Sequence, residues 1–246
     1  MKNFILAICL TFLSDSVNNA DAEFSDFMKG YSALKSLTGS ITQYIYNGPS
    51  VEKFSGEYSA VAGGWFRIDY LSPERQIVVR NSKGLYWYYP GKELVFVGYG
   101  GIDKNNNITC LPGISLSGSF RDVKIFYEGI RFYGFLKYAH VYSFCSGAEG
   151  GTVRIWFDPG RKYIVRKYIT DSSGMEMMKE VYHEYFFQEG VPVPTVIELF
   201  ARSDNGIVHT LTEYKDLVIN APINRRTFEF NVKKNMTLRR LNEIQD

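Results

Sequence analysis

The sequence has few of the residues that carry out catalysis or bind metals. Its 246 residues include three histidines and three cysteines. The histidines, His140, His183 and His209, are widely separated, and none has a second histidine at the spacing of a zinc-hydrolase motif. No complete nucleophile elbow or glycine-rich nucleotide loop is present. The sequence therefore predicts a protein that is not an enzyme and that needs no metal or cofactor.

A strong charge of one sign and long apolar runs are also missing. The formal net charge is +2, which gives no reason to expect a nucleic-acid partner. Hydrophobic residues make up 45% of the chain and charged residues 22%, as in ordinary globular proteins. No apolar run is long enough to predict a membrane-spanning helix.

The first 22 residues have the pattern of a cleaved export signal. Lys2 precedes an apolar segment at 4–13, and Ala20 and Ala22 form a small-x-small cleavage site. The apolar segment is too short to act as a membrane anchor. A lipoprotein signal is disfavoured because Ile8 is bulky and Cys9 lies inside the apolar segment. We expect a signal peptide at 1–22 and a single domain at 23–246.

Two cysteines, Cys110 and Cys145, remain after such a cleavage. An exported protein folds in an oxidising compartment, where a disulfide between them would persist. The alternative is two buried, unpaired cysteines, because connectivity cannot be deduced from spacing. The sequence leaves both open.

Aromatic residues are abundant, at 16% of the chain, and they favour half-buried sheet. From Phe24 to Leu37, apolar residues recur every three or four positions, which predicts an amphipathic helix ending at Gly39. Beyond it, runs alternating with a period of two predict about eleven antiparallel strands. The candidate runs are at 40–47, 54–61, 65–71, 75–81, 84–90, 92–98, 123–129, 136–146, 152–170, 178–187, 194–202 and 208–220, with a short candidate around Phe228 to Phe230.

So many strands must curl to protect their edges. Residues 99–120 are rich in glycine, asparagine and serine, which predicts a long loop. The expected fold is mainly β: a strongly curved, half-open antiparallel β-barrel with an N-terminal helix and a helix or loop lid.

The aromatic stretch from Gly63 to Phe96 suggests a binding surface. Within each strand the apolar residues share one face, and a curved sheet with few helices does not fill its own concavity. Such alternation is equally typical of an ordinary core, and the alternative is an apolar ligand site. The predicted lining residues are Phe66, Ile68, Tyr70, Ile77, Val79, Leu85 and Trp87.

The same stretch resembles the periplasmic lipoprotein carrier (LolA) family of outer-membrane lipoprotein-sorting proteins. The resemblance rests on the order of "WFRIDYLSPERQIVVRNSKGLYWYYP", on "LKSLTGSITQ" before it and on "YKDLVINAPINRRTFEFNVKKNMTLRRL" at the end. It is weakest between residues 99 and 200. The family commonly has an Arg-Pro pair that helps to close its lid, and this sequence has Ala62 and Gly63 there.

The resemblance implies a monomeric periplasmic chaperone that holds the acyl chains of lipoproteins between the inner and outer membranes. Its implied partners are acylated lipoproteins, an inner-membrane lipoprotein-releasing transporter and, in some bacteria, an outer-membrane receptor. The alternatives are a module of the same fold that senses lipids or lipoproteins and, less favoured, an envelope enzyme.

Overall fold

The computed structural model describes residues 22, 24–30, 33–98, 124–146, 151–188, 190–203 and 206–240. Within these ranges, residues 24–30 are helical, and no helix is long and apolar enough to cross a membrane. The strands of the described residues are β1 (Ser36–Asn47), β2 (Ser50–Val61), β3 (Trp65–Ser72), β4 (Gln76–Asn81), β5 (Gly84–Tyr89), β6 (Leu94–Gly98), β7 (Phe126–Gly134), β8 (Lys137–Ser146), β9 (Gly151–Asp158), β10 (Tyr163–Thr170), β11 (Glu176–Gln188), β12 (Val191–Ser203), β13 (Gly206–Ile219) and β14 (Thr237–Arg240).

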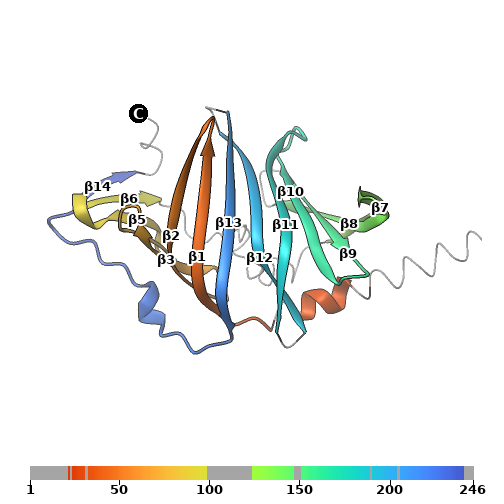
Figure 1. Cartoon of the computed structure of the whole chain (residues 1–246), viewed down its shortest axis with the longest axis horizontal. Coiled ribbons are helices and arrows are strands. Elements are labelled where there is room, and N and C mark those ends of the chain that lie inside the picture. Colours follow the sequence, from red (N-terminus) through yellow and green to blue (C-terminus); the bar gives the residue numbers. More distant parts are fainter. Residues whose placement is uncertain are drawn as a thin grey trace, which may run out of the picture.

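All fourteen described strands belong to one sheet, in the order β14-β6-β5-β4-β3-β2-β1-β13-β12-β11-β10-β9-β8-β7. Every neighbouring pair is antiparallel except β14 and β6, which run parallel. The sheet is strongly curved and does not close (Figure 1). The predicted mainly β, half-open antiparallel barrel is therefore confirmed, although it has more strands than the eleven expected.

The main hydrophobic core covers one face of the sheet, which we call the inner face. It joins strands from both halves of the sheet; for example, Tyr58 of β2 packs edge-on against Tyr214 of β13, with 5.2 Å between ring centroids. Leu37, Val193 and Phe157, from three separate strands, are fully buried in it. This core curves the sheet by drawing its two halves together over the inner face.

The N-terminal helix covers the inner face near β8 and β9. Phe24 stacks on Tyr142 at 4.1 Å between ring centroids, and Phe27 packs on Phe157 at 5.1 Å. The prediction of a helix reaching Gly39 was wrong, because β1 begins at Ser36 and Leu37 therefore lies in a strand.

Gly39 does not end a helix; it allows two neighbouring strands to approach each other closely. A Cβ atom there would lie 2.7 Å from the carbonyl oxygen of Lys215, so only glycine fits where β1 and β13 come close. The register of the two strands shifts at this point, between Thr38 and Ser40.

The opposite, outer face is covered at β3 to β6 by the segment that follows β13. A 3-10 helix at Arg225–Phe228 places Phe228, 1% exposed, against Trp65 at 6.3 Å between ring centroids. The strand predicted around Phe228 to Phe230 was therefore wrong. Further along, Phe230 packs over Tyr86 and Tyr88 in a second, smaller core.

Two predicted features lie outside the described residues. They are the loop at 99–120, with the lid expected from it, and Cys110. Cys145 is exposed at the end of β8, and its disulfide with Cys110 stays a prediction.

Candidate functional site

A cavity of about 110 Å³ opens on the inner face where the two halves of the sheet approach each other. Its apolar walls come from strands on both sides: Phe66 and Ile68 from β3, and Ile197 and Leu199 from β12. The remaining lining residues are Ile41, Gln43, Tyr58, Glu180, Thr210, Thr212 and Tyr214. The cavity is thus mostly apolar, with a few polar groups on one side, as ligand sites generally are.

The polar groups of the cavity form a short hydrogen-bonded chain. Tyr70 donates its hydroxyl to Oε1 of Gln43 at 2.9 Å, and Nε2 of Gln43 donates to Oγ1 of Thr212 at 3.4 Å. Burial raises the pKa of Tyr70, so its hydroxyl stays a donor at physiological pH. The Thr210 hydroxyl is buried and has no hydrogen-bond partner among the described residues.

A buried ion pair lies beside this chain. Lys167 of β10 and Glu180 of β11 are cross-strand partners, with Nζ 2.7 Å from Oε1. Their side chains are only 5% and 7% exposed, and the Tyr182 hydroxyl also donates to Glu180. Because each charge neutralises the other, Glu180 can line an apolar cavity without an unpaired charge facing a ligand.

The structure brings together five of the seven predicted lining residues. Phe66, Ile68 and Tyr70 lie on the inner face, and the pairing of Arg80 with Leu85 and of Val78 with Trp87 places Leu85 and Trp87 there too. Phe66 and Ile68 line the cavity, Tyr70 bonds to its polar chain, and Leu85 and Trp87 extend the same face along β5.

The placement of Ile77 and Val79 on that face was wrong. Ile68 pairs with Val78 and Phe66 with Arg80, so Val78 lies on the inner face and Ile77 and Val79 point to the outer one. The side chain of Val79 is fully buried there.

The sequence-based prediction missed the half of the cavity that β11, β12 and β13 provide. Ile197 and Leu199 flank Glu198, but Val196 and Phe200 beside them are also apolar, so the period of two gives only a weak signal there. Thr210 and Thr212 could not be found in this way, because the apolar Leu211 between them faces the other way.

Ala62 and Gly63, at the place of the family's Arg-Pro pair, lie in the turn between β2 and β3. The amide of Ala62 donates to the carbonyl of Lys35 at 2.8 Å, and Gly63 has a φ of 96°. Both residues are exposed, and neither has a charged side chain that could act as a latch.

A second polar cluster, on the outer face, joins two of the three histidines. Glu198 of β12 lies between His183 of β11 and His209 of β13, with carboxylate-to-Nε2 distances of 3.0 and 2.9 Å. The His209 ring is stacked between Tyr46 and Phe200 at 4.3 and 4.5 Å between centroids. These residues are far apart in sequence, so nothing in the sequence indicated the cluster.

This cluster predicts a pH-dependent contribution to stability. Burial raises the pKa of Glu198, but hydrogen bonds from His183 and His209 outweigh it, so the pKa lies below its ordinary value of 4.5. The carboxylate therefore stabilises the fold above pH 4.5, and this stabilisation is lost as the pH falls through the lowered value. Glu198→Gln should lower the free energy of unfolding by up to about 1 kcal/mol at neutral pH.

Urea denaturation of the two proteins across the acidic range would measure this difference, which should shrink toward low pH. Glu213→Gln, on the same face of β13, is the matched control and should show a smaller effect. A difference that grew on acidification would contradict the role of the carboxylate.

Comparison with known proteins gives matches in structure but not in sequence. No protein-family model matches the chain, and no curated protein matches it. A DUF1329 family protein from Desulfovibrio piger superposes with a TM-score of 0.64 at 11% identity, over 85% of this chain and 97% of that one. A LolA superfamily protein from Nitrosomonas europaea superposes with a TM-score of 0.60 at 10% identity, over 84% and 97%.

A putative outer-membrane lipoprotein-sorting protein domain from Vibrio parahaemolyticus also superposes with a TM-score of 0.60 at 10% identity, over 84% of this chain and 94% of that one. At such low identity these likenesses concern the fold. They confirm the fold that the resemblance in the sequence implied: the chain shares its fold with the LolA superfamily protein and with the lipoprotein-sorting protein domain.

Proposed function

We propose that the protein is a periplasmic carrier that binds the acyl chains of lipoproteins on its inner face and moves them from the inner to the outer membrane. The observation that carries this proposal is the apolar cavity between Phe66 and Ile68 on one side and Ile197 and Leu199 on the other. Most of its few polar groups bond to one another, so the site offers apolar area rather than reactive chemistry.

The size of the cavity determines how much of an acyl chain it can enclose. At about 110 Å³ it is smaller than the engineered cavity of about 150 Å³ that binds benzene, so it encloses only a short part of an acyl chain. The rest of the chain would follow the inner face past Leu85 and Trp87. Each buried methylene contributes about 0.8 kcal/mol, so such contact suffices for tight binding.

The fold shared with lipoprotein-sorting proteins supports this choice of ligand. In this proposal residues 1–22 are a signal peptide, and residues 23–246 form the carrier domain, a non-enzyme in the periplasm. Its partners are an inner-membrane transporter that releases lipoproteins and, at the end of the path, an outer-membrane receptor.

A charge placed in the cavity should weaken the binding of an acyl chain. Ile68→Glu would put a carboxylate against apolar walls, and we expect at least a tenfold loss of affinity for a fluorescent fatty-acyl probe. Leu71→Glu is the matched control, since Leu71 lies in the same strand but on the other face, where it is 60% exposed. This variant should bind the probe with the affinity of the parent protein.

Because Ile68→Glu can also affect folding, a second variant fills the cavity without adding charge. Leu199→Trp should reduce probe binding while the far-ultraviolet circular dichroism of the protein stays the same. Unchanged affinity in both variants would rule out this cavity as the acyl site.

A further inference from the structure

The hairpin of β7 and β8 carries a group of exposed apolar side chains at one end of the sheet. Figure 1 shows β7 at the end of the molecule farthest from β14. Phe132, Phe135 and Leu136 are 75%, 91% and 81% exposed. Ile130 and Tyr138, at 41% and 45%, complete what we call the hairpin patch. Apolar side chains this exposed and this close together mark an interaction site.

The turn of this hairpin places a leucine in a backbone conformation that disfavours it. Gly134 pairs with Lys137, so Phe135 and Leu136 alone form the two-residue connection. Such turns favour asparagine and glycine, and Leu136 has a φ of 55° in the left-handed region. Neither side chain is buried by the fold in return, so the apolar turn serves something other than stability.

The hairpin of β1 and β2, at the centre of the sheet, makes the contrast clear. The connection of β1 and β2 has the sequence Asn47-Gly48-Pro49-Ser50, a polar turn with residues suited to it. The apolar tip is therefore a property of the β7–β8 hairpin and not of the fold.

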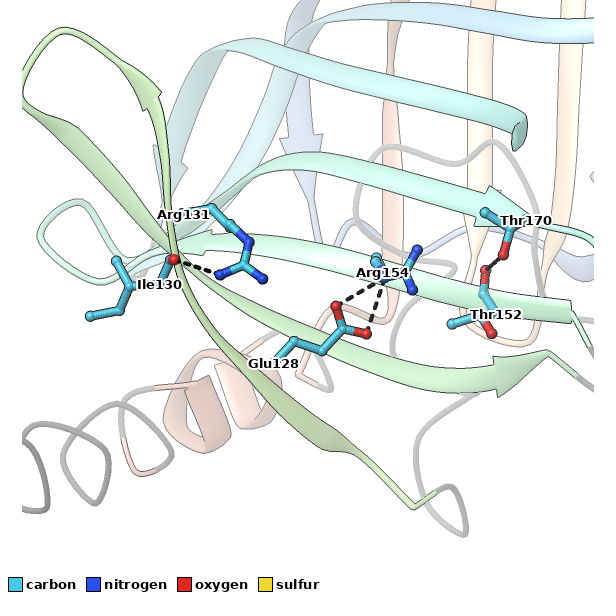
Figure 2. A network of polar contacts seen from close by, with 6 residues as sticks. All are labelled: Glu128, Ile130, Arg131, Thr152, Arg154 and Thr170. Atoms are coloured by element: carbon cyan, nitrogen blue, oxygen red, sulfur yellow. Dashed lines mark hydrogen bonds and ion pairs between the residues drawn. The ribbon is translucent and has the colours of Figure 1, made fainter. Parts of the chain in front are cut away.

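The charges within the hairpin tip are basic. From Ile130 to Tyr138 the chain contains Arg131 and Lys137 and no acidic residue. The nearest acid before it in sequence is Glu128, and Figure 2 shows its carboxylate facing Arg154 of β9, whose Nε lies 3.0 Å from both oxygens. Glu128 is thus neutralised within the sheet and does not offset the positive charge of the tip.

We propose that the β7–β8 hairpin inserts its tip into the interface of an anionic phospholipid bilayer. Phe135 and Leu136 would enter the acyl boundary, while Arg131 and Lys137 would contact the lipid phosphates. The register places Ile130, Phe132 and Tyr138 on the inner face, because Ile130 pairs with His140 and His140 with Phe157 of the core. The docked hairpin would therefore bring a membrane to the end of the face that holds the cavity.

Flotation of the purified protein with vesicles tests this inference. The protein should float with vesicles that contain phosphatidylglycerol, and binding to pure phosphatidylcholine vesicles should be much weaker. Phe135→Asn combined with Leu136→Gly should weaken binding at least tenfold. The same change gives the turn its favoured residues, so the hairpin should stay folded.

Two further variants separate the contributions. Arg131→Gln combined with Lys137→Gln should weaken binding to anionic vesicles about thirtyfold, and high salt should act in the same direction. Ile207→Asn, at another exposed apolar site, 66% exposed and in β13, is the matched control and should leave flotation unchanged.

The proposal fails if the parent protein does not float with anionic vesicles; the patch would then bind a protein instead. It also fails if the Ile207 variant and the hairpin variants lose binding equally. This inference does not rest on the acyl site. Hairpin variants should keep their affinity for the acyl probe in solution, and Ile68→Glu should lose the probe but still float.

Discussion

Lys167→Met should lower the free energy of unfolding by about 3–5 kcal/mol. The substitution leaves Glu180 charged at a position where its side chain is 7% exposed, and it removes the cation that lies 2.7 Å from the carboxylate. Although Glu180 lines the cavity, so little of its side chain is exposed that water does not replace the lost charge. Urea denaturation followed by circular dichroism would measure the loss.

Removing both charges together should have a very different result. Lys167→Met with Glu180→Leu replaces the pair by apolar side chains of similar volume, and we expect stability close to that of the parent or above it. Lys92→Met is the control for an exposed pair, because Lys92 and Glu74 are 58% and 43% exposed, and it should cost less than about 1 kcal/mol. If the double variant were as unstable as the single one, packing rather than charge would explain the loss.

Phe228→Ala should also lower the free energy of unfolding by about 3–5 kcal/mol, although Phe228 lies outside every strand. Its side chain is 1% exposed beneath the C-terminal segment, against Trp65 of β3. Two hydrogen bonds hold the same segment on the sheet: Asn81 donates to the carbonyl of Phe228 at 2.8 Å, and Arg67 donates to that of Thr227 at 3.3 Å.

Thermal unfolding and limited proteolysis together would test this effect. The variant should melt at a lower temperature and be cut more readily in the segment after Ile219. Phe187→Ala removes the same side chain from a site that is 55% exposed, and it should change stability by less than about 1 kcal/mol. Equal losses in the two variants would show that Phe228 does not anchor the segment.

The sequence predicted the inner face correctly where the other face is polar. In β3, Arg67 and Asp69 form an ion pair on the outer face, so the alternation with Phe66, Ile68 and Tyr70 was unambiguous. One face of this strand packs on the core and the other is polar, which is the condition under which alternation identifies the buried face.

The prediction failed in β4 for a physical reason. Ile77, Val78 and Val79 are consecutive apolar residues, because β4 is covered on both faces: by the main core inside and under the C-terminal segment outside. A strand buried on both sides has no alternation to show which residues face the cavity. The covering segment comes from the far end of the chain, so its presence could not be inferred from residues near β4.

The helix prediction was right at Phe24 and Phe27 and wrong at Leu34 and Leu37. All four side chains are buried in the same core, and their spacing continued across the change from helix to strand. The spacing of apolar residues shows which side chains are buried. It does not show where a helix ends when the following strand packs on the same surface.

The place of β1 in the sheet has a consequence for how the chain folds. β1 lies at the centre, and one of its two neighbours is β13, so that Ile41 pairs with Tyr214. The two halves of the sheet cannot join until nearly the whole chain has been synthesised, and pairing between such distant segments is slow. A nascent chain with this topology therefore completes its sheet only late in translation, after β13 has been synthesised.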